Sequence, residues 1–196
     1  MIAIDDAWSE LYSGTCFNLT KPDPGQILLS DIAVSLSRIC RFNGHCRAFY
    51  SVAQHSVIVF REMDNVAGWD DLDAPTWRAT LRAALLHDAH EAYLGDVISP
   101  VKQVSPAFVA LDGALRAAMS ERFDLSAARW ELVKQVDLMV LRAEAEDLMP
   151  SRGTAWGIAG IPRLPLTEIV PWAEARARNE FLSWASSLGL TEAMLA

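Results

Sequence analysis

Residues 84–96 read Ala-Leu-Leu-His-Asp-Ala-His-Glu-Ala-Tyr-Leu-Gly-Asp, and this stretch decides the fold that we predict. Upstream, Pro75 suits the first turn of a helix, and strong helix formers then continue from Trp77 to Tyr93. Gly95 ends the run, because glycine disfavours a helix interior. The sequence therefore predicts a helix over residues 77–93.

Polar residues interrupt the apolar character of this predicted helix. His87 and Glu91 are four residues apart and Asp88 and Glu91 three apart, so these side chains would share one helical face. Small or apolar neighbours, Ala83–Leu86 and Ala89, indicate that the helix is largely buried at this point. Buried imidazole and carboxylate groups need partners, because an unpaired charge is strongly disfavoured away from water.

The rest of the chain also shows helical rather than strand periodicity. Ser51–Gln54 has the spacing of a capping box, so a helix that carries His55 in its first turn begins there. Four prolines and three glycines make residues 150–171 a long loop, of a length that is often functional. We predict an all-α, single-domain helical bundle for residues 1–196, with little strand. The remaining expected helices run from about Ser30, over 106–123, over 126–148 and over 171–188.

Composition excludes several classes of protein. The formal charge of −8 argues against a surface that binds nucleic acid, which needs many cationic contacts to phosphate. No stretch reaches the eighteen or more apolar residues of a membrane-spanning helix, so we expect no membrane partner. The acidic start, Met1–Asp6, is unlike a signal peptide, and the three cysteines lack Cys-x-x-Cys spacing. We therefore expect a cytoplasmic protein with reduced thiols.

Asp137 carries a second polar signal. It lies four residues from both Val133 and Leu141, so its carboxylate projects from an apolar stripe. Taken alone, it is explained by an ion pair with a buried arginine or a bond to a helix end. Imidazole and carboxylate groups taken together suit divalent metals, which makes a metal ligand the competing explanation.

The order of these residues resembles a known signature. His55, the doublet His87-Asp88 and Asp137 follow the H…HD…D pattern of the HD phosphohydrolase superfamily. Around them the chain resembles the nucleotidase branch of that superfamily, over a match from about Phe17 to Leu148. Within the branch it is similar to bacterial 5′-deoxynucleotidases and to phage-type dATP triphosphohydrolases. The stretches that carry this resemblance are 37–45, 50–56, 84–96 and 99–102.

The resemblance implies an HD-type helical fold with a divalent metal ion, Co, Mn, Zn or Mg, and additional Mg with a polyphosphate substrate. The implied metal ligands are His55, His87, Asp88 and Asp137. Glu91 and Asp96 match catalytic carboxylates that act on the attacking water and the leaving group or hold further cations. For Asp96, a carboxylate that caps the turn after Gly95 is an equal alternative.

The resemblance also implies residues that bind substrate. Lys102 matches a lysine that contacts phosphate, although a solvated surface lysine is the simpler interpretation. Arg41 and Phe42 lie where relatives have an Arg-aromatic pair near sugar and base, and Phe42 could equally be core. The sequence does not decide whether His45 contacts substrate, and it favours a structural role for His90.

These residues lead to three hypotheses for function. The first is hydrolysis of dATP to deoxyadenosine and triphosphate. The second is hydrolysis of a deoxynucleoside 5′-monophosphate, which uses the same metal chemistry. The third is a non-catalytic HD module that binds a nucleotide, which is disfavoured because such a module has no chemical need for the two accessory carboxylates. Relatives assemble into dimers or rings, so the resemblance implies a homo-oligomer.

Overall fold

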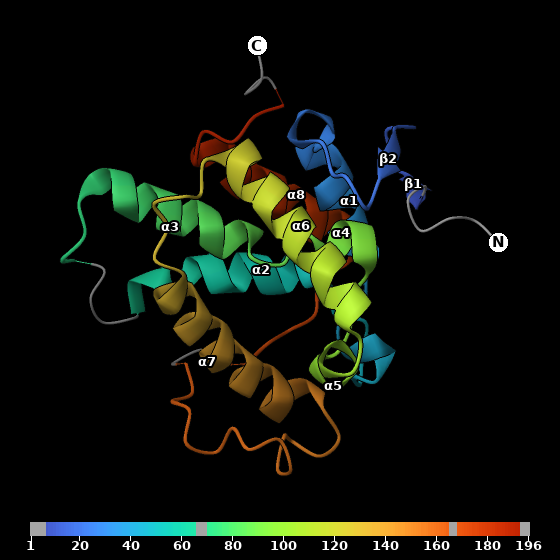
Figure 1. The fold of residues 1–196 in the computed structure, drawn as a ribbon. Coiled ribbons are helices and arrows are strands. Elements are labelled where there is room, and N and C mark those ends of the chain that lie inside the picture. The colour runs from blue at the N-terminus through green and yellow to red at the C-terminus, as the bar shows by residue number, and fades with distance from the viewer. Residues whose placement is uncertain (1–6, 66–69, 165–167, 193–196) are drawn as a thin grey trace.

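The structure, a computed structural model, describes residues 7–65, 70–164 and 168–192. Helices dominate it, which confirms the predicted all-α fold class (Figure 1). Two short strands, β1 (Trp8–Glu10) and β2 (Cys16–Asn18), pair antiparallel at the side of the bundle beside α1. The longer helices are α1 (Leu29–Arg38), α2 (Val52–Arg61), α3 (Ala74–Leu86), α6 (Pro106–Phe123), α7 (Trp130–Leu148) and α8 (Glu174–Ser187).

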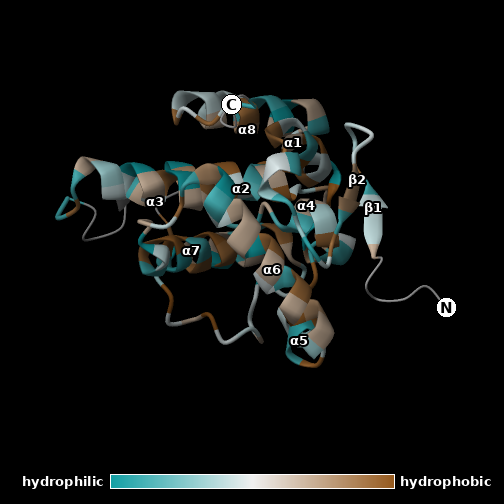
Figure 2. Ribbon diagram, turned by 45° about the horizontal axis from the view of Figure 1, so that its top comes forward, coloured by the Kyte–Doolittle hydropathy of each residue, from teal (hydrophilic) through white to brown (hydrophobic). Residues whose placement is uncertain are grey.

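Helix α2 is central to the bundle. Its residues 52–59 are all buried, and it contributes to both clusters of the hydrophobic core. The first cluster joins α2 to α1, α6 and α8, and the second joins it to α3 and α7. Hydrophobic and hydrophilic residues alternate along these helices (Figure 2), as expected for helices that bury one face. A polar side chain on α2 is therefore held in the middle of the molecule.

Local signals explain where several helices begin and end. The Ser51 hydroxyl accepts a hydrogen bond from the Gln54 amide, as the capping-box spacing predicts. The Asp73 carboxylate caps α3 in the same way, through the Thr76 amide. Helix α6 has the predicted bounds, whereas α7 begins at Trp130 rather than 126 and α8 at Glu174 rather than 171.

The prediction of one continuous helix over residues 77–93 is wrong. Helix α3 ends at Leu86, residues 87–90 form tight turns, and a short helix α4 (Glu91–Leu94) follows. Hydrogen bonds between residues three apart, such as Ala89 N–H to the Leu86 carbonyl, replace the α-helical pattern. The His87 ring Nδ1 bonds the Ala84 carbonyl at the end of α3. In this turn the consecutive residues His87 and Asp88 place His87 Nε2 and Asp88 Oδ2 3.1 Å apart.

A second short helix, α5 (Ser99–Gln103), carries Lys102 and was not predicted as a separate element. The predicted long loop after α7 is present, and its described part packs back on that helix. Asp147 accepts hydrogen bonds from the Arg163 guanidinium and from the Ile169 amide. Gln54 of α2 holds the end of the loop by bonding the Val170 carbonyl and the Trp172 amide. None of the helices in the described ranges combines the length and hydrophobicity needed to cross a bilayer.

Candidate metal centre

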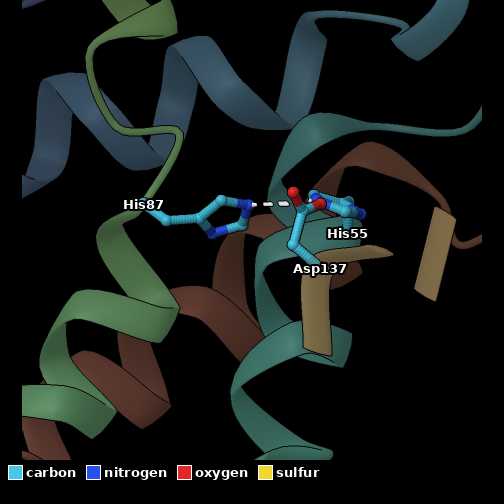
Figure 3. A group of neighbouring side chains, drawn as sticks. All are labelled: His55, His87 and Asp137. Carbon is cyan, nitrogen blue, oxygen red and sulfur yellow. Dashed lines mark hydrogen bonds and ion pairs between the residues drawn. The ribbon is translucent and has the colours of Figure 1, made fainter. Parts of the chain in front are cut away.

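The four residues predicted to bind metal converge from three separate elements. His55 comes from α2, His87 and Asp88 from the turn after α3, and Asp137 from α7. The two Nε2 atoms of His55 and His87 are 3.1 Å apart. Asp137 Oδ1 is 3.3 Å from His55 Nε2 and 3.9 Å from His87 Nε2, and Figure 3 shows these three side chains pointing toward one another.

Asp88 lies beside this group of three, on the side of His87, and itself belongs to a second group of close ligand atoms with His90 and Glu91. Its Oδ2 is 3.1 Å from His87 Nε2 and 3.6 Å from His55 Nε2. Bonds of about 2.0–2.2 Å to one metal ion, at tetrahedral or octahedral angles, place neighbouring ligand atoms about 2.9–3.6 Å apart. The separations between the two histidines, and from each aspartate to them, are 3.1–3.9 Å and lie close to that range. These donors therefore fit a divalent cation such as zinc, manganese or cobalt.

Each histidine is oriented through its other ring nitrogen. His55 Nδ1 lies 2.6 Å from a Glu144 carboxylate oxygen, and His87 Nδ1 lies 2.9 Å from the Ala84 carbonyl oxygen. Both partners accept, so each Nδ1 carries hydrogen and donates. The Nε2 atoms of both rings then face the centre, which is how metal-binding histidines are usually supported.

The electric field around the centre keeps its carboxylates ionised. Burial disfavours the Asp88 carboxylate, but His87, His55 and Arg41 outweigh burial and hold its pKa well below the ordinary value. Burial also opposes ionisation of Asp137, and the bond from His55 nevertheless lowers its pKa. Burial and Arg41 disfavour the His55 imidazolium, whereas Glu144 and Asp137 favour it and raise its pKa to about 9. In the absence of metal, a proton on His55 therefore balances these negative groups.

Glu144 is a functional candidate that sequence reasoning missed. This glutamate on α7 is fully buried, and it bonds His55 Nδ1 and, at 2.9 Å, Arg41 Nη2. Burial opposes its ionisation, but Arg41 and His55 lower its pKa to about 2. A signal existed in the sequence, because Glu144 is seven residues after Asp137 and two helical turns put both on one face.

Arg41, predicted to bind substrate, makes buried ion pairs with the chain itself. Besides Glu144, it faces Asp88, whose Oδ2 is 3.6 Å from Arg41 Nη1. These carboxylates outweigh the cost of burial and raise the pKa of its guanidinium further. The Glu144 carboxylate thus accepts hydrogen bonds from both His55, a predicted metal ligand, and Arg41, a residue predicted to bind substrate.

The predicted catalytic carboxylates lie next to the predicted metal ligands. Glu91, on α4, is buried, and burial together with Asp88 and Asp96 raises its pKa to about 9. Its Oε2 is a buried oxygen without a hydrogen-bond partner within the described part of the chain. Asp96 is half-buried after Gly95. Its carboxylate lies close enough to raise the pKa of both Glu91 and Arg41. Lys102 also points here, with Nζ 3.6 Å from Glu91 Oε1.

Phe42 lies at the edge of this group rather than in the hydrophobic core. Its ring centroid is 5.5 Å from that of Trp156, which comes from the long loop after α7. The Arg41 guanidinium lies 5.1 Å from the Phe42 centroid on another side. Trp156 was not predicted, because nothing local relates it to a residue more than a hundred positions earlier.

Two further histidines have contrasting surroundings. His45 is exposed in its loop and is not joined to the metal ligands. His90 is buried, with Nε2 3.0 Å from an Asp112 carboxylate oxygen and 2.9 Å from Arg116 Nη2. Arg116 also donates to the His87 carbonyl oxygen, so these three residues brace the turn that carries the ligands. The sequence favours a structural role for His90, and the ring also lies with Asp88 and Glu91 in a second group of ligand atoms close enough to hold a metal ion.

Fold and centre together define an all-helical protein with a buried histidine–aspartate cluster suited to a divalent cation. The chain is 34% identical over 172 residues to the uncharacterized protein YfdR of Escherichia coli strain K12, covering 87% of this chain and 89% of YfdR. It is 38% identical over 152 residues to the uncharacterized protein RCAP_rcc00048 of Rhodobacter capsulatus, covering 72% and 73%. No family model matches the chain. The chain belongs to the family of YfdR.

Proposed function

We propose that this chain is an HD-type, metal-dependent phosphohydrolase that cleaves dATP to deoxyadenosine and triphosphate. The observation that carries the proposal is the convergence of His55, His87 and Asp137 at ligand spacing, with Asp88 beside both histidines and each histidine anchored through Nδ1. A purely structural ion-pair network has no need for two Nε2 atoms 3.1 Å apart in the core. The proposal for dATP rests on the resemblance of residues 37–45.

The reaction breaks the bond between the α-phosphorus and the 5′ oxygen of the nucleoside. A bound divalent cation supplies polarisation of the phosphoryl group and lowers the pKa of the attacking water. In the metal-free protein the pKa of Glu91 is about 9, so its carboxyl group is protonated at neutral pH, and in this position it can donate a proton to the departing 5′ oxygen. The Asp96 carboxylate, half-buried after Gly95, is the group placed to accept a proton from water. Lys102 neutralises phosphate charge beside them.

The nucleoside would lie against the aromatic pair Phe42 and Trp156. Aromatic rings offer stacking surfaces to any base, so the pair provides affinity rather than discrimination. Preference between dATP and dGTP must come from the shape of the pocket and from polar groups that the wrong base leaves unpaired. We expect dATP to be cleaved faster than dGTP.

A second candidate substrate is a deoxynucleoside 5′-monophosphate, whose hydrolysis breaks the same bond. One observation favours it: the arginine side chains at the centre are already paired with carboxylates. Arg41 pairs with Glu144 and Asp88, and Arg116 pairs with Asp112. A triphosphate would bring more negative charge than these groups balance, so its hydrolysis would require additional Mg²⁺.

Hydrolysis of a nucleotide panel tests the proposal. Protein stripped of metal by a chelator is supplied with Mg²⁺, Mn²⁺, Co²⁺ or Zn²⁺ and with dATP, dGTP or dAMP, and the products are separated by ion-exchange chromatography. We expect deoxyadenosine and triphosphate from dATP. Asp137→Asn should lose this activity, whereas Asp124→Asn, an exposed carboxylate at the end of α6, should keep it.

Each other outcome selects a different function. Faster cleavage of dAMP than of dATP would assign the monophosphatase activity. Binding of nucleotide without turnover under every metal condition would assign the non-catalytic module and overturn the proposal. A cytoplasmic location and a homo-oligomeric state belong to the same proposal, and size-exclusion chromatography with light scattering measures the latter.

A further inference from the structure

Two cysteine thiols lie in contact next to the candidate centre. The Sγ atoms of Cys40 and Cys46 are 3.6 Å apart, and the Cys46 thiol also lies 3.8 Å from the Arg41 carbonyl oxygen. Both side chains are partly exposed, so a small reagent can reach them. The chain's other cysteine, Cys16, is exposed on β2. Neither Cys40 nor Cys46 has a role in the proposed hydrolysis.

The backbone on both sides holds this pair together. Cys40 forms a β-bridge with Ser51, and Arg47 donates its amide hydrogen to the Leu148 carbonyl at the end of α7. Between the two anchors, residues 42–44 reverse the chain with φ values of 57°, 52° and 77°. Two of these are the non-glycine residues Phe42 and Asn43, and such conformations persist only when the surroundings enforce them. The proximity of the thiols is therefore set by the fold.

We propose that Cys40 and Cys46 form a redox-modification site that closes to a reversible disulfide under mild oxidation. With hydrogen peroxide, one thiolate attacks an oxygen atom, which gives a sulfenic acid and releases water after protonation. The second thiol then attacks that sulfur, the S–S bond forms, and a second water leaves. In total, two thiols and one peroxide become one disulfide and two water molecules, and a dithiol reductant reverses the change.

The structural change needed for this bond is small. A disulfide requires sulfur atoms about 2.05 Å apart, so thiols at 3.6 Å must approach by roughly 1.5 Å. Partial burial and the hydrogen bond with Cys40 raise the pKa of the Cys46 thiol, so formation should accelerate with rising pH. Sequence composition predicts reduced thiols, and the geometry adds that oxidation would link this pair. Intracellular disulfides of this kind are usually transient and redox-sensing.

The disulfide would enclose the segment that reaches the candidate centre. Residues 41–45 lie inside the covalent loop, and they include Arg41, which pairs with Glu144 and Asp88, and Phe42, which packs on Trp156. Oxidation would therefore restrict the loop in its present conformation. The site itself does not rest on the proposed function, because its evidence is the placement of the thiols.

Alkylation and peptide mapping of the full chain test the proposal. Cys16→Ser protein is treated with hydrogen peroxide, alkylated under denaturing conditions and weighed by mass spectrometry, alongside an unoxidised sample. Reduced protein should take two alkyl groups and oxidised protein none. Trypsin cleaves after Arg38, Arg41 and Arg47, so peptides 39–41 and 42–47 should appear as one linked species that separates on reduction.

Matched variants and a folding measurement complete the test. In the Cys16→Ser background, Cys40→Ser and Cys46→Ser should form no disulfide within the molecule after the same treatment, and a dithiol reductant should return one alkylatable thiol to each. Oxidised Cys16→Ser protein should keep its circular dichroism spectrum and unfold at the same temperature as reduced protein or higher. Two alkylatable thiols after oxidation, disulfides only between molecules, or a lower unfolding temperature would each overturn the proposal.

Discussion

Replacement of Glu144 by glutamine tests whether this buried carboxylate stabilises the protein and orients His55. The carboxylate accepts bonds from two cationic or hydrogen-donating groups, His55 Nδ1 at 2.6 Å and Arg41 Nη2 at 2.9 Å. Glutamine has nearly the same shape but only one accepting oxygen, so its amide N–H₂ would face one of these donors. Glu144→Gln therefore removes a charge and leaves a buried donor without a partner, with little change in volume.

The structure sets the size of both expected effects. Arg41 would remain buried with Asp88, at 3.6 Å, as its nearest carboxylate, and breaking a buried pair from one side costs about 3–5 kcal/mol. We therefore expect unfolding free energy to fall by about 3 kcal/mol or more. Loss of a partner that orients a metal-binding histidine weakens metal affinity about 10–100-fold, which corresponds to about 1.4–2.7 kcal/mol.

Two measurements and one control separate these effects. Urea unfolding in the presence of a chelator gives the stability of the metal-free protein, and competition with a chromophoric chelator gives the metal affinity. The control is Glu146→Gln, the same change two residues further along α7. Glu146 pairs with Arg142 and Arg163 near the surface, so the control should stay within about 0.5 kcal/mol of the parent protein. Equal behaviour of the two variants would refute the assigned role of Glu144.

Three other predictions concern catalysis, pH and substrate. Glu91→Gln should retain bound metal and lower kcat roughly 10²-fold, because it removes a positioned proton donor; normal kcat at saturating substrate would make Glu91 structural. His55 has its pKa raised from 6.5 to about 9, so its protonated form stabilises metal-free protein fully below about pH 6.5, and this contribution is lost as pH rises through about 9. Metal competes with the same proton, so affinity should increase up to about tenfold per pH unit across that range, and pH-independent binding would contradict this. Phe42→Ala should raise KM for dATP more than it lowers kcat, because stacking stabilises the bound substrate and the transition state equally. Steady-state kinetics measure both constants, and an unchanged KM would show that Phe42 does not contact the substrate.

The sequence by itself determined the features that depend on near neighbours along the chain. Helix α6 has the bounds that its periodicity and Pro106 predict, and the Ser51 cap sits where the capping box indicates. Both signals are complete within a few residues, because caps and helical hydrogen bonds join residues three or four apart. The four predicted ligands were found through a sequence signature, and the structure brings them together.

Only the tertiary structure decided which groups meet across large separations in sequence. His55 and His87 are 32 residues apart, and His55 and Glu144 are 89 apart. The tight turn at residues 87–90 also escaped prediction, because helix propensity favours a continuous helix there and the contacts with α6 override it. Phe42 meets Trp156 for the same reason. Cys40 and Cys46 are only six residues apart, but they meet because packing holds the left-handed turn between them. Such contacts follow from how helices and loops pack, which local preferences along the chain do not encode.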